Sequence, residues 1–424
     1  SLMEKVLHDV KELLEEEKEI RGGKIDIKFN QPDADGYTTI FYEPASKYEP
    51  KAEKNEKRDA LAETVDQSEF AFINSLENPI TSDEAILSIV NQYLEGNLNP
   101  EEVDADPTPE TAEAKAAREA LEAKLFGKWT DELRSMTQEQ IDQGVEDGTL
   151  EKPAFESFRN EALRIIDAGQ ANTPDELYAA FDKRLANAVQ DETRRKERLT
   201  QIFNRYGAPT IGEDGNFVAR SLYKSETTRY EDIQEVLYIS LDKKNSYDMV
   251  SQFIDSADEA GISYNIEGNL NTDKRPDAIA INVSTANLRA SVAILKSIAE
   301  QNPQMIEDKG ELSPFVTSVD GWIGVASEPL DSHVDEDGEA HAQSFFEKRA
   351  RIAESAILKA AQSWVGRHQN DPVKFKDGSE STVGKYYGNI SEDAAKRARL
   401  VKFIAANQPK NLILETRDNM MREA

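Results

Sequence analysis

Short β-rich runs alternate with amphipathic helical runs between residues 235 and 302, and this alternation constrains the fold more than any other feature. Residues 235–241 and 277–283 have the composition of strands, and the run ISYNIEG lies between them. The intervening segments, KKNSYDMVSQFIDSADEAG and TANLRASVAILKSIAEQNP, carry apolar residues at helical spacing. Strands separated by helices predict an α+β or α/β-type domain, which we place at residues 208–424.

The first half of the chain has the composition of helices. Residues 59–206 predict a helical region, with an acidic, proline-containing linker near 97–113. Residues 3–58 predict a helix over 3–20 followed by a small β-hairpin around the turn sequence NQPDADG. The expected fold class is therefore α+β, with a helical N-terminal half followed by an α/β-type domain.

Charge and composition exclude several classes of function. The 424 residues include no cysteine, which removes disulfides, thiolate catalysis and cysteine-based zinc sites. The net charge of −30 disfavours nucleic acid and anionic membranes as partners. No apolar run reaches the ~20 residues of a membrane span, and the segment after Met3 is not a secretory signal. We expect a cytoplasmic protein, or alternatively one that is translocated or secreted without a classical signal peptide.

The stretch DSHVDEDGEAHAQSFFEKRAR, residues 331–351, holds two of the four histidines. A calcium loop that starts at His333 fails, because position 1 is then a histidine and position 12 is Ser344. The zinc motif with two histidines four residues apart fails as well, since His333 and His341 are eight apart. We expect an acidic loop with a turn, no metal and no other cofactor, although the templates do not decide whether residues 331–341 hold a metal.

The second half of this stretch places Arg349 and Arg351 near the beginning of a predicted helix. Guanidinium groups match phosphate oxygens, and a helix N-terminus adds positive potential, so the pair is a candidate anion site. Two ordinary solvated charges on a helix surface are the alternative. Spacing does not distinguish the two interpretations.

Five segments occur in an order that resembles a known family. They are VLYISL, GISYNIEG, RPDAIAINV, SPFVTSVDGWIGVASEP and SFFEKRARIAESAILKA. Together they resemble the effector family of plant-pathogen type III secretion that is related to phosphothreonine lyases, with relatives in lanthipeptide maturation. The resemblance covers about residues 230–365. The matching positions are Pro314, Phe315, Thr317, Gly321 or Gly324, Ala326, Glu328 and Pro329, followed by Ser344, Phe345, Arg349 and Arg351.

The resemblance implies a bacterial protein with a small central sheet and β-elimination of phosphate from phosphothreonine or phosphoserine. That chemistry needs a base, an acid and arginines that hold the phosphate. The sequence departs from the family at two of these roles. Tyr238 stands where the family has its acidic histidine. Asn265 and Glu267 stand where a strand lysine is expected, which leaves Lys274 or Lys224 from loops.

The predicted site combines one catalytic candidate with several anion-binding candidates. Tyr238 is the catalytic candidate, although a strand aromatic that packs in the core is the alternative. The anion-binding candidates are Arg275, Arg349, Arg351, Ser240 and Lys274.

Three functions follow from the sequence. The first is a lyase-like domain that binds a phosphorylated or anionic protein or peptide without full lyase chemistry. The second is an active phosphoserine or phosphothreonine lyase, that is, a carbon-oxygen lyase acting on phosphate. The third is a non-enzymatic interaction protein that docks partners through its helical half. The missing lysine and histidine favour the first over the second.

Overall fold

A computed structural model gives the fold of the protein. It describes residues 25–29, 40–44, 56–65, 82–146, 152–206, 209–212, 214–221, 235–327, 332–334, 340–342, 344–388, 390 and 393–423. The helix predicted over residues 3–20 lies outside this part. The strands β1 (Ile25–Phe29) and β2 (Ile40–Pro44) flank the predicted turn and pair antiparallel.

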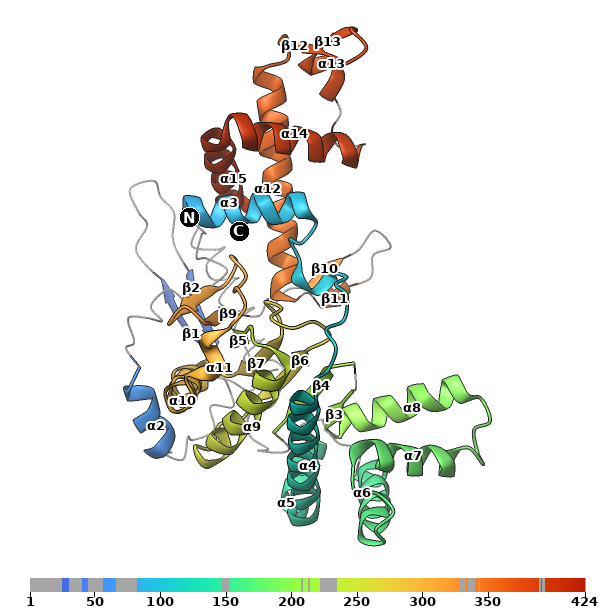
Figure 1. Ribbon diagram of the computed structural model, residues 1–424. Coiled ribbons are helices and arrows are strands. Elements are labelled where there is room, and N and C mark those ends of the chain that lie inside the picture. The colour runs from blue at the N-terminus through green and yellow to red at the C-terminus, as the bar shows by residue number, and fades with distance from the viewer. Residues whose placement is uncertain are drawn as a thin grey trace, which may run out of the picture.

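Seven strands of the described chain form one antiparallel sheet in the order β3-β4-β6-β7-β5-β9-β8 (Figure 1). The protein is therefore α+β, as the sequence predicts. The strands are β3 (Thr210–Ile211), β4 (Asn216–Arg220), β5 (Glu235–Ile239), β6 (Asn265–Asn269), β7 (Ile279–Val283), β8 (Thr317–Val319) and β9 (Ile323–Ser327).

The centre of the sheet is a β-α-β-β-α-β unit. It runs β5, α9 (Lys243–Glu259), β6, β7, α10 (Leu288–Gln301) and, after the edge strand β8, β9. The strand β5 lies between β7 and β9. Each helix thus connects two strands that have a third strand between them, which is the split βαβ topology. The 3-10 helix η3 (Thr285–Asn287) precedes α10, and α11 (Gln304–Glu307) follows it.

The two faces of the sheet belong to different hydrophobic cores. Leu237 and Ile239 of β5 pack in the core that contains α9 and α10. Val236 and Tyr238, which alternate with them, pack in the core of α12 (Phe345–Arg367). This follows from the period of two in a strand. The long helix α12 thus lies on the opposite face of the sheet from α9 and α10.

Helices from both ends of the chain surround α12. The helix α3 (Asp83–Glu95) shares its core with α14 (Ala394–Asn407) and α15 (Pro409–Glu423), and Figure 1 shows all three around the upper part of α12. The remaining elements near α12 are β10 (Ser332–Val334), β11 (Ala340–Ala342), β12 (Pro372–Lys374), β13 (Glu380–Thr382) and α13 (Val383–Tyr387). The sequence predicts helical character for the region of α3 and a helix at the beginning of α12, but not their association, because α3 is far from α12 along the chain.

A third core of the described chain is entirely helical. It contains α4 (Ala112–Ser135), α5 (Gln138–Glu146), α6 (Lys152–Asp167), α7 (Pro174–Leu185) and α8 (Glu192–Arg205). The helix α4 also packs beside α9, where Lys124 pairs with Asp255 at 2.6 Å and Lys128 pairs with Asp258 at 2.7 Å. The helix α4 therefore joins the helical core to the sheet.

Residues 99–111, which we call the strap, contain most of the predicted acidic linker. The strap begins with the 3-10 helix η2 (Pro100–Glu102) and crosses the loop that leads to β7. The Thr108 amide donates to the Asn271 carbonyl at 2.9 Å, and the Thr108 hydroxyl accepts from the Asp273 amide at 3.0 Å. Hydrogen bonds thus hold the strap against the sheet domain, although its composition is polar.

Packing crosses the boundaries of the three predicted parts. The helix α2 (Glu56–Glu63) lies against α10, and α3 lies in the core of α12. The division at residues 58 and 206 stays a prediction. Within the part of the chain that the structure describes, no helix combines the length and the apolar composition that crossing a membrane requires.

Candidate functional site

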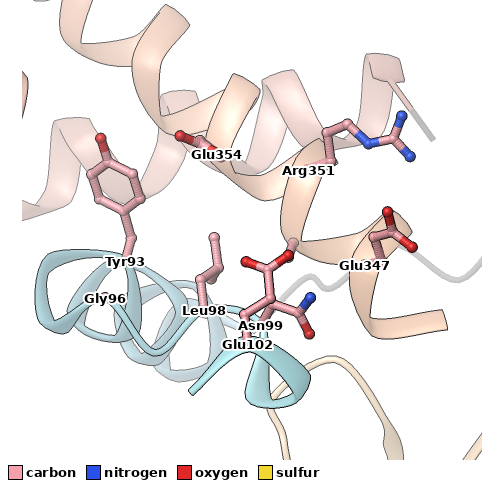
Figure 2. A pocket seen from close by; sticks show the side chains of 9 residues that line it. Tyr93, Gly96, Leu98, Asn99, Glu102, Glu347, Arg351 and Glu354 are labelled. Carbon is pink, nitrogen blue, oxygen red and sulfur yellow. The ribbon is translucent and has the colours of Figure 1, made fainter. Parts of the chain in front are cut away.

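The end of α3, the helix η2 and the first turns of α12 enclose a cleft of about 420 Å³ (Figure 2). Its walls come from segments far apart in the sequence. Tyr93 and Glu354 lie at one end of the cleft in Figure 2, and Arg351 and Glu347 lie at the other. The full lining is Tyr93, Gly96, Leu98, Asn99, Glu102, Glu347, Ala350, Arg351 and Glu354.

Local rules of helix formation place these side chains. Gly96 ends α3 in the left-handed conformation, with φ of 76°, and turns the chain into η2. Ser344 caps α12, since its hydroxyl accepts from the Glu347 amide at 3.1 Å. Glu347, Arg351 and Glu354 then follow at helical spacing and share one face of α12.

The cleft is negatively charged. Three described carboxylates line it, from Glu102, Glu347 and Glu354, against one guanidinium, from Arg351, which leaves a charge of −2. The chain as a whole is negative as well, with a net charge of −30. A cationic group is therefore favoured in the cleft over an anionic one.

Tyr93 supplies a neutral hydroxyl at one end of the cleft. Burial raises the pKa of Tyr93 above its ordinary value of 10.0, and the charge of Glu354 adds to the rise. A hydrogen bond from Arg397 of α14 opposes it. The phenol therefore keeps its proton at neutral pH and presents a polar group beside an apolar ring.

Tyr238 and Arg349 lie in an aromatic cluster beneath this part of α12. Tyr238 is 4% exposed, and its ring centroid lies 4.5 Å from that of Phe346. The Arg349 guanidinium lies 5.5 Å from the centre of the Phe345 ring, and burial lowers its pKa. Both residues contribute to the core between α12 and the sheet, which is the alternative considered for Tyr238.

The other predicted residues meet in the loop before β7. The Arg275 Nε and Nη2 atoms donate to the Asp277 carboxylate at 2.9 and 3.2 Å, and Nη1 donates to the Val103 carbonyl of the strap at 3.2 Å. Lys274 pairs with Asp308 at 2.6 Å, and the Ser240 hydroxyl donates to the Lys274 carbonyl at 2.8 Å. These contacts fasten the loop and the strap together.

Of the six predicted site residues, Arg351 alone is in the described lining of the cleft. Anion binding by the group stays a prediction, but Arg275 and Lys274 already have carboxylate partners. Sequence reasoning missed Tyr93 and Glu102. The one part of the lining that the sequence indicates is the helical spacing of Glu347, Arg351 and Glu354. The opposite wall has no signal in the sequence, because it comes from a distant segment.

Glu101 connects the strap to the beginning of α12 and should make stability depend on pH. It accepts a hydrogen bond from the Ser344 hydroxyl at 2.5 Å. Burial raises its pKa, the Ser344 bond opposes the rise, and Asp277, Glu347 and Glu267 add to it. The folded state thus holds this proton more tightly than the unfolded chain. Protonated Glu101 therefore stabilises the folded state. This contribution is fully present below the ordinary pKa of 4.5 and is lost as the pH rises through the folded-state pKa of Glu101.

We therefore expect Glu101→Gln to be more stable than the wild type at pH 8, and to lose this advantage as the pH falls toward 4.5. Urea unfolding at a series of pH values measures the difference. Glu102→Gln, at the next residue, controls for the loss of one negative charge. A constant difference between Glu101→Gln and the wild type across this range would contradict the assignment.

No protein-family model matches the chain, and no curated protein matches it. Within the described residues, no group of three or more histidine, aspartate or glutamate side chains is arranged to hold a metal ion.

Proposed function

We propose that this protein is a non-catalytic binding protein that receives a positively charged segment of a partner protein in the cleft between α3, η2 and α12. The observation that carries the proposal is the lining, where three glutamates of the described chain accompany one arginine. The overall charge of −30 adds a long-range attraction for a basic partner and accelerates encounter at low salt.

The dimensions and composition of the cleft suit one or two side chains of a peptide. Its volume of about 420 Å³ is within the usual range for ligand sites, which is roughly 300–1,000 Å³. Leu98 and the ring of Tyr93 offer apolar contact beside the carboxylates. Lysine and arginine combine an aliphatic stem with a charged end, so this pairing of surfaces matches their chemistry.

The environment of the lyase candidates supports a binding role over a catalytic one. Tyr238 is 4% exposed and packs against Phe346, so a substrate does not reach its hydroxyl without movement of α12. The Lys274 ammonium is paired with Asp308 and is a poor base in its charged form. A phosphopeptide-binding domain and an active lyase are the alternative proposals, and both require an anion site.

Binding of a fluorescent arginine- and lysine-rich peptide, measured by anisotropy, tests the proposal. We expect the double variant Glu347→Gln/Glu354→Gln to bind roughly fivefold to thirtyfold more weakly, because exposed charge pairs contribute about 0.5–1 kcal/mol each. Arg351→Ala should bind more tightly, since it removes the one described cation of the lining. Glu197→Gln on α8, an exposed glutamate away from the cleft, is the matched control.

Three outcomes would contradict the proposal. The first is equal binding of the basic peptide by the wild type and the double variant. The second is preferential binding of a phosphothreonine peptide that is lost in Arg351→Ala, which would favour the anion site. The third is loss of the elements of phosphoric acid from that peptide, seen by mass spectrometry. This loss is larger than that of simple hydrolysis and would support the lyase.

A further inference from the structure

The C-terminal part of the chain has the opposite charge from the rest. Residues 359–424 contain twelve lysines and arginines against eight aspartates and glutamates, a net charge of +4. Because the whole chain carries −30, residues 1–358 carry −34. The helix α14 is the extreme case, since its 14 residues include four cations and no carboxylate. A cationic helix thus lies in a strongly acidic protein.

Helical spacing divides α14 into a buried face and an exposed face. The buried residues lie in the core of α12 and are Leu400, Val401 and Ile404. Arg399, Lys402 and Phe403 alternate with them and are exposed, and we call these three residues the basic face. Within the described chain, neither cation of the basic face has a carboxylate at ion-pair distance.

The other two cations of α14 make contacts within the protein. The Arg397 Nη1 atom donates to the Ile390 carbonyl at 3.3 Å, and the same side chain forms a hydrogen bond with Tyr93. The Lys396 ammonium lies 5.0 Å from the centre of the Tyr386 ring. These two side chains contribute to the fold, which leaves the basic face for a partner.

Phe403 gives the basic face an apolar contact. Its ring is 49% exposed, and its centre lies 5.8 Å from that of the buried Trp364 ring at the end of α12. Figure 1 shows α14 crossing α12 near the end that is away from the sheet. Aromatic and arginine side chains are enriched among the residues that carry most of the binding energy in protein interfaces. The basic face combines both kinds.

We propose that the basic face binds an acidic segment of a partner protein, one that carries at least one large apolar side chain. Carboxylates of the segment pair with Arg399 and Lys402, and the apolar side chain packs on Phe403. This site is separate from the proposed function, because its partner has the opposite charge from the one that the cleft receives.

Charge selects this partner over three other anionic ones. A nucleic acid or an anionic membrane extends well beyond one helix face, so residues 1–358, with their charge of −34, would repel it. A second copy of the chain brings the same −34 with it. A short acidic segment avoids this repulsion, because it lies on the basic face without extending over the acidic remainder of the molecule.

Fluorescence anisotropy of a glutamate-rich peptide that contains one phenylalanine, with the full-length protein at low salt, tests the proposal. We expect Arg399→Gln/Lys402→Gln to bind roughly fivefold to thirtyfold more weakly, because two exposed charge pairs are lost. Arg194→Gln/Arg198→Gln on α8 is the matched control, since it removes two exposed cations outside the basic face. It should bind as the wild type does, and equal losses in the two double variants would overturn the proposal.

A double-mutant cycle tests the contact with Phe403. Phe403→Ala should weaken binding at least about fivefold, and so should a peptide in which alanine replaces the phenylalanine. The two changes together should cost little more than either alone, because both remove the same contact. Fully additive losses would overturn this contact and with it the proposed partner.

The cleft variant Glu347→Gln/Glu354→Gln separates this site from the proposed function. It should bind the acidic peptide at least as well as the wild type, because it removes two negative charges and leaves the basic face intact. Weaker binding in it would place the peptide at the cleft and overturn the proposal. Loss of basic-peptide binding in the same variant concerns the cleft alone.

Four other results would also overturn the proposal. The first two are tighter binding of a single-stranded oligonucleotide, or of phosphatidylserine vesicles, than of the acidic peptide, when that binding is lost in Arg399→Gln/Lys402→Gln. The third is self-association of the wild type in sedimentation that the same variant abolishes, which would assign the basic face to a second copy. The fourth is the absence of saturable peptide binding by the wild type.

Discussion

Phe346→Ala is expected to destabilise the protein by about 3–5 kcal/mol, the usual range for a buried phenylalanine. Phe346 is fully buried and its ring lies 4.5 Å from that of Tyr238. Its removal leaves a cavity at the point where the first turn of α12 contacts the sheet. Urea unfolding followed by circular dichroism measures the free energy of unfolding directly.

Phe403→Ala is the matched control, since Phe403 on α14 is 49% exposed and makes one edge contact with Trp364. We expect it to lose less than about 1.5 kcal/mol. Equal losses in the two variants would mean that α12 does not rest on the sheet through Phe346. The position of the cleft, whose one wall is α12, would then be wrong as well.

Arg275→Ala is expected to lose about 3–5 kcal/mol, because it leaves the buried Asp277 carboxylate without its ion-pair partner. The same change removes the hydrogen bond to the Val103 carbonyl, so the strap should be cleaved faster in limited proteolysis. Urea unfolding and cleavage within residues 99–111 are the two measurements.

Two variants make the interpretation of Arg275→Ala specific. The double variant Arg275→Ala/Asp277→Ala should recover part of the stability, since no unpaired charge is then buried. Lys274→Ala removes the neighbouring cation, which pairs with Asp308 at the surface, and should leave unfolding unchanged. If Lys274→Ala and Arg275→Ala behaved alike, the buried pair would not be what fastens the strap.

The sequence predicts the local elements of the sheet domain well. The runs that become β5, β6 and β7 and the helices α9 and α10 follow from period and composition, because both patterns are local. The order of the strands does not follow, since β9 is far from β5 along the chain but pairs with it. The packing of α3 against α12 is a long-range contact of the same kind.

The candidate site is harder to predict for the same physical reason. Arg351 is visible as a charge on a predicted helix, whereas the opposite wall at Tyr93 and Glu102 depends on tertiary packing. Arg275 illustrates a second limit. As an arginine in a loop it is a natural candidate for an anion ligand, but its guanidinium donates both Nε and Nη2 to the carboxylate of Asp277, two residues later. The strap is a third case, because backbone hydrogen bonds hold a segment that hydropathy assigns to a linker.

The strap also bears on the order in which the protein assembles. Residues near Thr108 bond to residues near Asn271, and Glu101 bonds to Ser344, so these contacts join segments that are synthesised far apart in time. Loops of such length are slow to close, and contacts of this sequence separation form late in folding. The cleft and its charged rim should therefore be among the last parts to acquire their shape on the ribosome, after the split βαβ unit has formed.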